Sequence, residues 1–123
     1  MTTTAVILLV PAGGALGAVL RYVIDGYVKA FAGTAFPWGT LTVNVLGAAA
    51  LGALHGAGTG KLTEALLGTG LCGALTTFST FELDTVHLIQ DGSYAKAAVN
   101  AVGSLLLGLL AFLALHALLH RLA

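Results

Sequence analysis

Residues 76–81, Thr76-Thr77-Phe78-Ser79-Thr80-Phe81, place four hydroxyl groups and two phenyl rings inside an almost wholly apolar chain. The sequence is 58% hydrophobic and 8% charged, with a mean hydropathy of +0.98. Hydroxyls in such surroundings cost free energy unless they bond to backbone, water or a bound ion. β-branched threonines that follow a glycine also disfavour a continuous helix. The stretch therefore predicts a break in a membrane helix over residues 73–81, with side chains and freed carbonyls available for binding.

The low charge content predicts an integral membrane protein, because soluble domains carry about 25% charged residues. A membrane-spanning helix needs about 20 residues, so 123 residues hold one all-α domain, residues 1–123, with four spans. Net charge is zero and there is no basic run, which argues against a nucleic-acid surface. The single cysteine, Cys72, excludes an intrachain disulfide. The predicted spans cover residues 5–29, 39–56, 62–89 and 94–119.

Basic residues outside the spans are balanced between the two sides of the membrane. Lys61 and Arg121 fall on the side of the N-terminus, and Lys29 and Lys96 on the opposite side. The positive-inside rule needs an excess on one side to set an orientation. The balance therefore allows insertion both ways, and with it an antiparallel dimer whose two-fold axis lies in the membrane plane. The alternative is a single orientation, set by a small bias from Arg21 or by a partner.

Glycines four residues apart occur twice and predict close helix contacts in lipid. These pairs are Gly13 with Gly17 and Gly52 with Gly56. Other glycine patterns carry no function. Residues 68–73 match the dinucleotide-binding fingerprint only in letters, since no strand precedes them.

Enzyme chemistry has no support in the sequence. Residues 56–63 resemble a phosphate-binding loop, but the spacing of that motif fails. His116 and His120 are four apart on a helix, without an apparent third metal ligand. No serine has an evident histidine and acidic residue to complete a catalytic triad, and no pair of carboxylates is spaced for general acid–base catalysis. We expect neither an enzyme nor an organic cofactor.

Four polar residues at membrane depth are candidates for transport, because ionisable groups within spans are functional candidates by default. They are Arg21, Asn44, Glu82 and Asp84. Arg21 could attract an anion into an aqueous vestibule. Alternatively it could snorkel, or pair with Asp25 one turn on. Asn44 could donate an N–H to an anion or form an interhelical hydrogen bond.

The two phenylalanines, Phe78 and Phe81, are three residues apart, so both rings can face one direction on a helix. Aromatic ring edges carry partial positive charge and can contact a small desolvated anion. The hydroxyls of Ser79 and Thr80 could continue such a path. Simple packing is the alternative interpretation of the ring pair.

Three groups of residues carry a resemblance to a known family: Gly13-Gly14-Ala15-Leu16-Gly17-Ala18 with Arg21-Tyr22, Gly39-Thr40-Leu41 with Val43-Asn44 and Gly47, and Gly73 with Thr76-Thr77-Phe78-Ser79-Thr80-Phe81. In this order on four short spans, they resemble the small bacterial fluoride channels (Fluc, also called CrcB), over nearly the whole chain. The resemblance implies a dual-topology homodimer of four-helix subunits with two antiparallel fluoride pores, in the bacterial inner membrane.

The resemblance also implies a role for each candidate residue. Arg21 would lie at a vestibule, with Asp84 or Glu82 at the pore mouth. The backbone carbonyls of Gly73 and Thr76 would hold a buried Na⁺ at the dimer centre. The implied pore residues are Phe78 and Phe81, with rings from both subunits, Asn44 as an anion contact, and Ser79, Thr80 and Ser104 on a polar track.

Three residues depart from the family pattern. Ala74 stands where a second glycine is common, Asp84 where the family often has Glu, and Asn100 where a Tyr is frequent. The shorter carboxylate of Asp84 leaves the role at the pore mouth open between Asp84 and Glu82.

The first functional hypothesis is therefore passive fluoride export. HF crosses a membrane as a neutral molecule and ionises inside, so a pore driven by the membrane potential can expel fluoride and give resistance to it. A proton-coupled small multidrug exporter is a second hypothesis, but such an exporter requires a glutamate in the first span, where this chain has Arg21 and Asp25. A structural membrane protein is the third.

Overall fold

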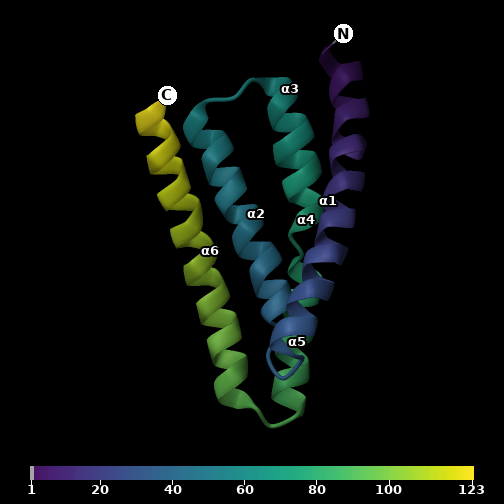
Figure 1. The fold of residues 1–123 in the computed structure, drawn as a ribbon, viewed down its shortest axis with the longest axis vertical. Helices are drawn as coiled ribbons and strands as arrows, with labels where there is room; N and C mark the ends of the chain where they lie inside the picture. The colour runs from purple at the N-terminus through teal and green to yellow at the C-terminus, as the bar shows by residue number, and fades with distance from the viewer. Residues whose placement is uncertain (1) are drawn as a thin grey trace.

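The structure, a computed structural model, describes residues 2–123, so Met1 of the predicted domain lies outside the described part. Every element in the described residues is helical (Figure 1), as the composition predicts. The elements are α1 (Thr2–Ala32), α2 (Trp38–Ala57), α3 (Lys61–Thr63), the π-helix η1 (Glu64–Cys72), α4 (Gly73–Leu75), α5 (Phe78–Gln90) and α6 (Tyr94–Leu122).

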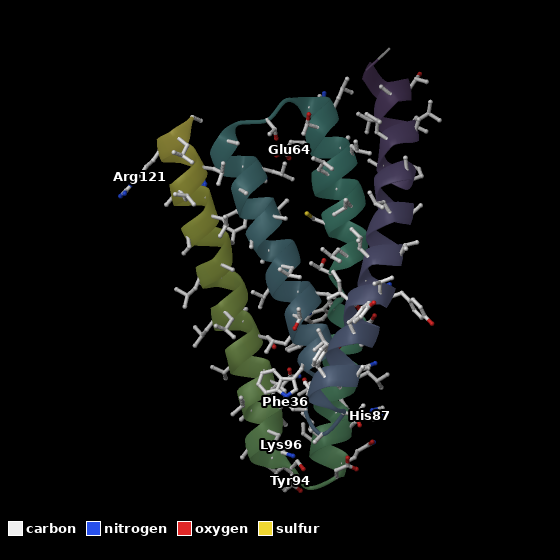
Figure 2. The ribbon with its side chains drawn as sticks, in the orientation of Figure 1. Phe36, Glu64, His87, Tyr94, Lys96 and Arg121 are labelled. Atoms are coloured by element: carbon white, nitrogen blue, oxygen red, sulfur yellow. The ribbon has the colours of Figure 1, made fainter. Side chains whose placement is uncertain are left out.

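The helices run up and down between two ends of an elongated molecule (Figure 1). Both termini and the α2–α3 loop lie at one end, called here the terminus end. The α1–α2 and α5–α6 loops lie at the other, the loop end. Figure 2 shows Glu64 and Arg121 at the terminus end and His87 and Lys96 at the loop end. These four polar residues thus lie at the two ends of the molecule.

Three helices of the described chain are long and apolar enough to cross a membrane, namely α1, α2 and α6. The segment predicted as the third span, residues 62–89, consists instead of the shorter elements α3, η1, α4 and α5. The π-helix η1 was not predicted, and π-helices are rare and often occur at functional sites. Many leucines of α6 are exposed on the single chain, as expected of a lipid-facing helix.

Both predicted glycine pairs are confirmed as close helix contacts. A methyl group at Gly13 or Gly17 would overlap backbone carbonyls of η1. Methyl groups at Gly52 and Gly56 would overlap the backbone of α6 at Phe112 and His116. The first pair fixes η1 against α1, and the second fixes α6 against α2. The segment that follows η1, α4, contacts both α1 and α2.

Candidate functional site

The helix that precedes the polar stretch ends at Leu75, and the next begins at Phe78. Between them Thr76 (φ −81°, ψ 157°) and Thr77 (φ −148°, ψ 122°) have extended backbone. Thr77 is the N-cap of α5, because its Oγ1 accepts a hydrogen bond from the Thr80 amide at 3.2 Å. Of the break predicted over residues 73–81, only Thr76 and Thr77 have extended backbone, because Gly73–Leu75 and Phe78–Gln90 are helical.

The side chain of Asn44 on α2 forms hydrogen bonds with both the amide and the carbonyl of a single residue in the extended segment, Thr77. Its Oδ1 accepts from the Thr77 amide at 2.7 Å, and its Nδ2 donates to the Thr77 carbonyl at 3.0 Å. Buried backbone groups require such partners, and Thr77 is buried. The interhelical hydrogen bond considered for Asn44 is therefore present. The side-chain amide also carries a second N–H, which these two contacts leave available.

The hydroxyls next to this contact form a cluster. Thr77 Oγ1 donates to Thr80 Oγ1 at 3.1 Å and lies 3.5 Å from Ser79 Oγ. Ser79 and Thr80 are exposed on the single chain. Thr77 was not among the predicted pore residues, although it is the buried centre of the cluster. Its signal in the sequence is a threonine three residues before Thr80 at a helix start, which is typical of an N-cap.

Arg21 of α1 reaches the same segment. Its Nη1 lies 3.5 Å from the Thr76 carbonyl. It lines a cavity of about 370 Å³ together with Thr40, Thr77 and Thr80. The alternative pairing of Arg21 with Asp25 is wrong, because Asp25 forms an ion pair with Lys29 at 2.8 Å. Asp25 has a basic residue one turn away in both directions, and Lys29 is the one it binds.

The rings of Phe78 and Phe81 are neighbours, as their spacing predicts. Their centroids are 5.9 Å apart, with 37° between the ring planes. Phe78 is 69% exposed on the single chain, whereas Phe81 is half-buried. Both follow directly on the extended segment, at the start of α5.

Ser104 of α6 is connected to α5 through a series of hydrogen bonds. Its Oγ donates to Asn100 Oδ1 at 3.3 Å, and Asn100 Nδ2 donates to Thr85 Oγ1 at 2.9 Å. Thr85 Oγ1 in turn donates to the Phe81 carbonyl at 2.8 Å. Asn100, one of the three residues that depart from the family pattern, is 1% exposed and connects Ser104 to Thr85 by hydrogen bonds. Thr85 and Asn100 were not predicted as site residues. The four-residue step from Asn100 to Ser104 places these two on one face of α6, but the sequence has no comparable signal for Thr85.

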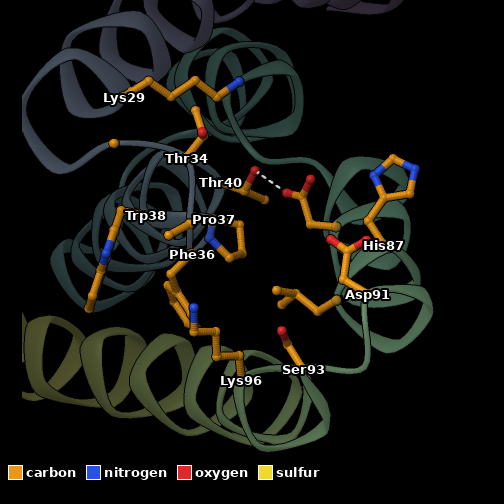
Figure 3. Close-up of a pocket in the computed structure, with 14 residues that line it drawn as sticks. Lys29, Thr34, Phe36, Pro37, Trp38, Thr40, His87, Asp91, Ser93 and Lys96 are labelled. Carbon is orange, nitrogen blue, oxygen red and sulfur yellow. Dashed lines mark hydrogen bonds between the residues drawn. The ribbon is translucent and has the colours of Figure 1, made fainter.

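The two candidate carboxylates differ in placement. Asp84 Oδ2 accepts a hydrogen bond from Thr40 Oγ1 at 2.7 Å, which Figure 3 marks with a dashed line. Asp84 and Thr40 both line a cavity of about 510 Å³ at the loop end. Glu82 is exposed on the single chain. Thr40 lines the loop-end cavity and also the cavity that holds Arg21 and Thr80, so the two cavities meet at this residue.

The carbonyls of Gly73 and Thr76 suit a hard cation in their donor chemistry. In a continuous helix the Thr77 amide would bond the Gly73 carbonyl, but it bonds Asn44 instead. Gly73 and Thr76 both border a groove of about 520 Å³ toward the terminus end. Unwound backbone carbonyls in membrane proteins coordinate Na⁺. The residues present therefore fit the implied ion in their donor chemistry, although Arg21 donates to the Thr76 carbonyl at 3.5 Å and places a positive charge beside it.

Comparison with known proteins gives a family and close relatives. The family model described as CrcB-like protein, Camphor Resistance (CrcB), matches residues 8–115. The chain is similar to fluoride-specific ion channel FluC 1 of Streptomyces avermitilis, with 49% identity over 106 residues that cover 83% of this chain and 86% of the relative. It is also similar to fluoride-specific ion channel FluC of Magnetococcus marinus (48% over 104 residues, covering 80% and 85%) and of Shewanella oneidensis (47% over 100 residues, covering 78% and 81%).

Proposed function

This chain belongs to the CrcB family, and on that premise we propose that it is a fluoride channel that exports cytoplasmic fluoride. It is a multi-pass protein of the bacterial membrane and not an enzyme. The observation that supports the proposal best is the polar segment at Thr76 and Thr77, which is surrounded by Asn44, Arg21 and hydroxyl groups. It occurs in a chain whose relatives are named fluoride-specific ion channels. The multidrug-exporter and structural hypotheses are set aside.

The geometry supplies what a fluoride ion needs after it loses water. Selectivity in channels comes from protein groups that replace the hydration shell. Hydroxyl groups of Ser79 and Thr80 and the second N–H of Asn44 are hydrogen-bond donors for an anion. The edges of Phe78 and Phe81 add partial positive charge without a fixed ion. Arg21 raises the local anion concentration in its cavity, and the weak-acid trapping of HF provides the direction of export.

The segment from α3 to α5 is the third of four membrane crossings, interrupted at Thr76 and Thr77. Support comes from the connections, because α2 ends at the terminus end and α6 begins at the loop end (Figure 1). The chain between them must therefore travel the full length of the molecule. Non-helical backbone at membrane depth is tolerated where it is buried in protein or lines a cavity, and the contacts of Asn44 meet that condition.

The channel is an antiparallel homodimer with fluoride paths between the subunits. A single chain leaves Gly73, Phe78, Ser79 and Thr80 exposed in the middle of the molecule. Hydroxyl and backbone groups that face hydrocarbon without hydrogen bonds cost free energy. A second copy of the chain that packs on this surface would remove that cost. The balanced positions of the four basic residues outside the spans favour opposite orientations of the two copies.

A sodium ion at the dimer centre would be held by the backbone carbonyls of Gly73 and Thr76 from both subunits. Bound there, it would supply a positive charge that ties the two extended segments together. We expect the thermal unfolding temperature of the purified protein to be higher in NaCl than in N-methyl-D-glucamine chloride of equal ionic strength. An ion that binds only the folded state adds about 2.7 kcal/mol at 100 times its Kd. Equal unfolding temperatures in the two salts would contradict the sodium site.

Growth in fluoride tests the proposed export. A bacterial strain without its own fluoride exporter, expressing this chain, is expected to grow at fluoride concentrations that stop the same strain with an empty vector. Matched NaCl controls separate fluoride toxicity from a general salt effect. Growth no better than that of the empty-vector strain, with the protein present in the membrane fraction, would contradict fluoride export.

A further inference from the structure

The two oxygens of the Asp25 carboxylate have different surroundings. Oδ2 accepts from Lys29 Nζ at 2.8 Å. Oδ1 is buried and, among the residues that the structure describes, has no hydrogen-bond partner. A buried polar atom without a partner costs about 1–3 kcal/mol and is uncommon in native proteins. Its position therefore needs an explanation other than the ion pair with Lys29.

Oδ1 of Asp25 lies against the first turn of α2. A methyl group added to Gly39 would overlap this oxygen, and Gly39 is buried. Helix α2 begins at Trp38 with Pro37 at the N-cap position, and no side chain caps it. The first N–H groups of a helix have no acceptor within it, and its N-terminus carries partial positive charge. The Asp25 carboxylate thus lies at the positive end of α2 and packs against Gly39 without a hydrogen bond to it.

The first turn of α2 and Asn44 lie on the same helix, little more than one turn apart. Residue 44 lies five positions after Gly39, about 7.5 Å further along the helix axis. Asp25 also lines the cavity that contains Thr40 and Thr77. Since a helix moves as a rigid element, a shift of its first turn displaces the Asn44 amide from the Thr77 backbone. We infer that Asp25 is a positioning residue that holds the start of α2 against α1 and so sets the contact of Asn44 with Thr77.

Five variants test this role in fluoride efflux from liposomes, a readout that rests on the proposed function. Asp25→Ala is expected to slow efflux by about tenfold or more, because small misplacements of binding groups have large effects on rate. Asp25→Asn keeps an oxygen at the same place and should recover most of the loss. Gly39→Ala should slow efflux comparably, because its methyl group displaces Oδ1. Lys29→Met is the matched control: it removes the ion pair and one of the four basic residues outside the spans but leaves Asp25 beside Gly39, and it should stay close to the unmodified protein.

The combined variant Asp25→Ala with Gly39→Ala decides the matter. Residues in direct contact give non-additive effects, so the double variant should be no slower than the slower single variant. The inference is overturned if the two effects multiply, if Asp25→Asn is as slow as Asp25→Ala, or if Lys29→Met is as slow as Asp25→Ala. If the unmodified protein conducts no fluoride, the proposed function fails instead. The same cycle measured by thermal unfolding in detergent then tests the Asp25–Gly39 contact alone.

Discussion

Replacing Asn44 with alanine is expected to reduce fluoride efflux by about 100-fold or more, because the variant loses both the anion contact and the support of the extended segment. The amide and carbonyl of Thr77 would lose their partners, and each unsatisfied buried group costs about 1–3 kcal/mol. We therefore also expect a lower thermal unfolding temperature in detergent. A fluoride electrode measures the efflux from liposomes, and circular dichroism follows the unfolding.

Thr42→Ala is the matched control for Asn44. Thr42 lies on the same helix, and its hydroxyl donates only to the Trp38 carbonyl one turn earlier. Its loss should leave efflux within about threefold, since removing a local back-bond on a helix has little effect on stability. Asn44→Asp keeps the acceptor for the Thr77 amide, but it loses the donor to the Thr77 carbonyl and adds negative charge. It should therefore lose efflux and also unfold at a lower temperature than the unmodified protein. Unchanged efflux in Asn44→Ala would exclude this residue from the fluoride path.

Phe81→Ile is expected to reduce efflux by roughly 10- to 100-fold with a small effect on stability. The change keeps an apolar side chain at the same position but removes the ring edge that we propose faces the anion. Phe81 is half-buried, so the packing cost is about 1–2 kcal/mol. The efflux rate and the thermal unfolding temperature, measured on the same preparation, separate a loss of conduction from a loss of fold.

Phe112→Ile provides the comparison for the ring. Phe112 is a half-buried ring on α6, 5.9 Å from the ring of His55 and outside the polar segment. A similar packing loss is expected there without a loss of efflux. If Phe81→Ile and Phe112→Ile both lose efflux in proportion to their loss of stability, the ring of Phe81 has only a packing role.

Composition and spacing were sufficient for the helical fold and for several contacts. The apolar content predicted helices, and the four-residue glycine steps predicted close packing that the structure confirms at Gly13 with Gly17 and at Gly52 with Gly56. Hydroxyls after Gly73 predicted non-helical backbone, which the structure has at Thr76 and Thr77. The glycine predictions succeed because close helix contacts of this kind depend on local residue type.

Partners far apart in the sequence could not be predicted. A polar group at depth must be satisfied, but this rule does not say by which residue, and Asn44 and Thr77 are 33 positions apart. Similarly, Asp25 has Arg21 and Lys29 at equal spacing on its own helix, and only the tertiary position of Arg21 beside Thr76 explains the outcome. The contact of Asp25 with Gly39 depends on how α1 meets α2, which neither segment encodes alone.

The most direct test uses this protein purified alone and reconstituted into liposomes loaded with potassium fluoride. After addition of a potassium ionophore to balance charge, a fluoride electrode should record rapid efflux, while liposomes loaded with potassium chloride should release little chloride. That result would show that copies of this single chain form a fluoride-selective pathway. Absence of fluoride efflux from liposomes that contain folded protein, or equally fast release of chloride, would contradict it.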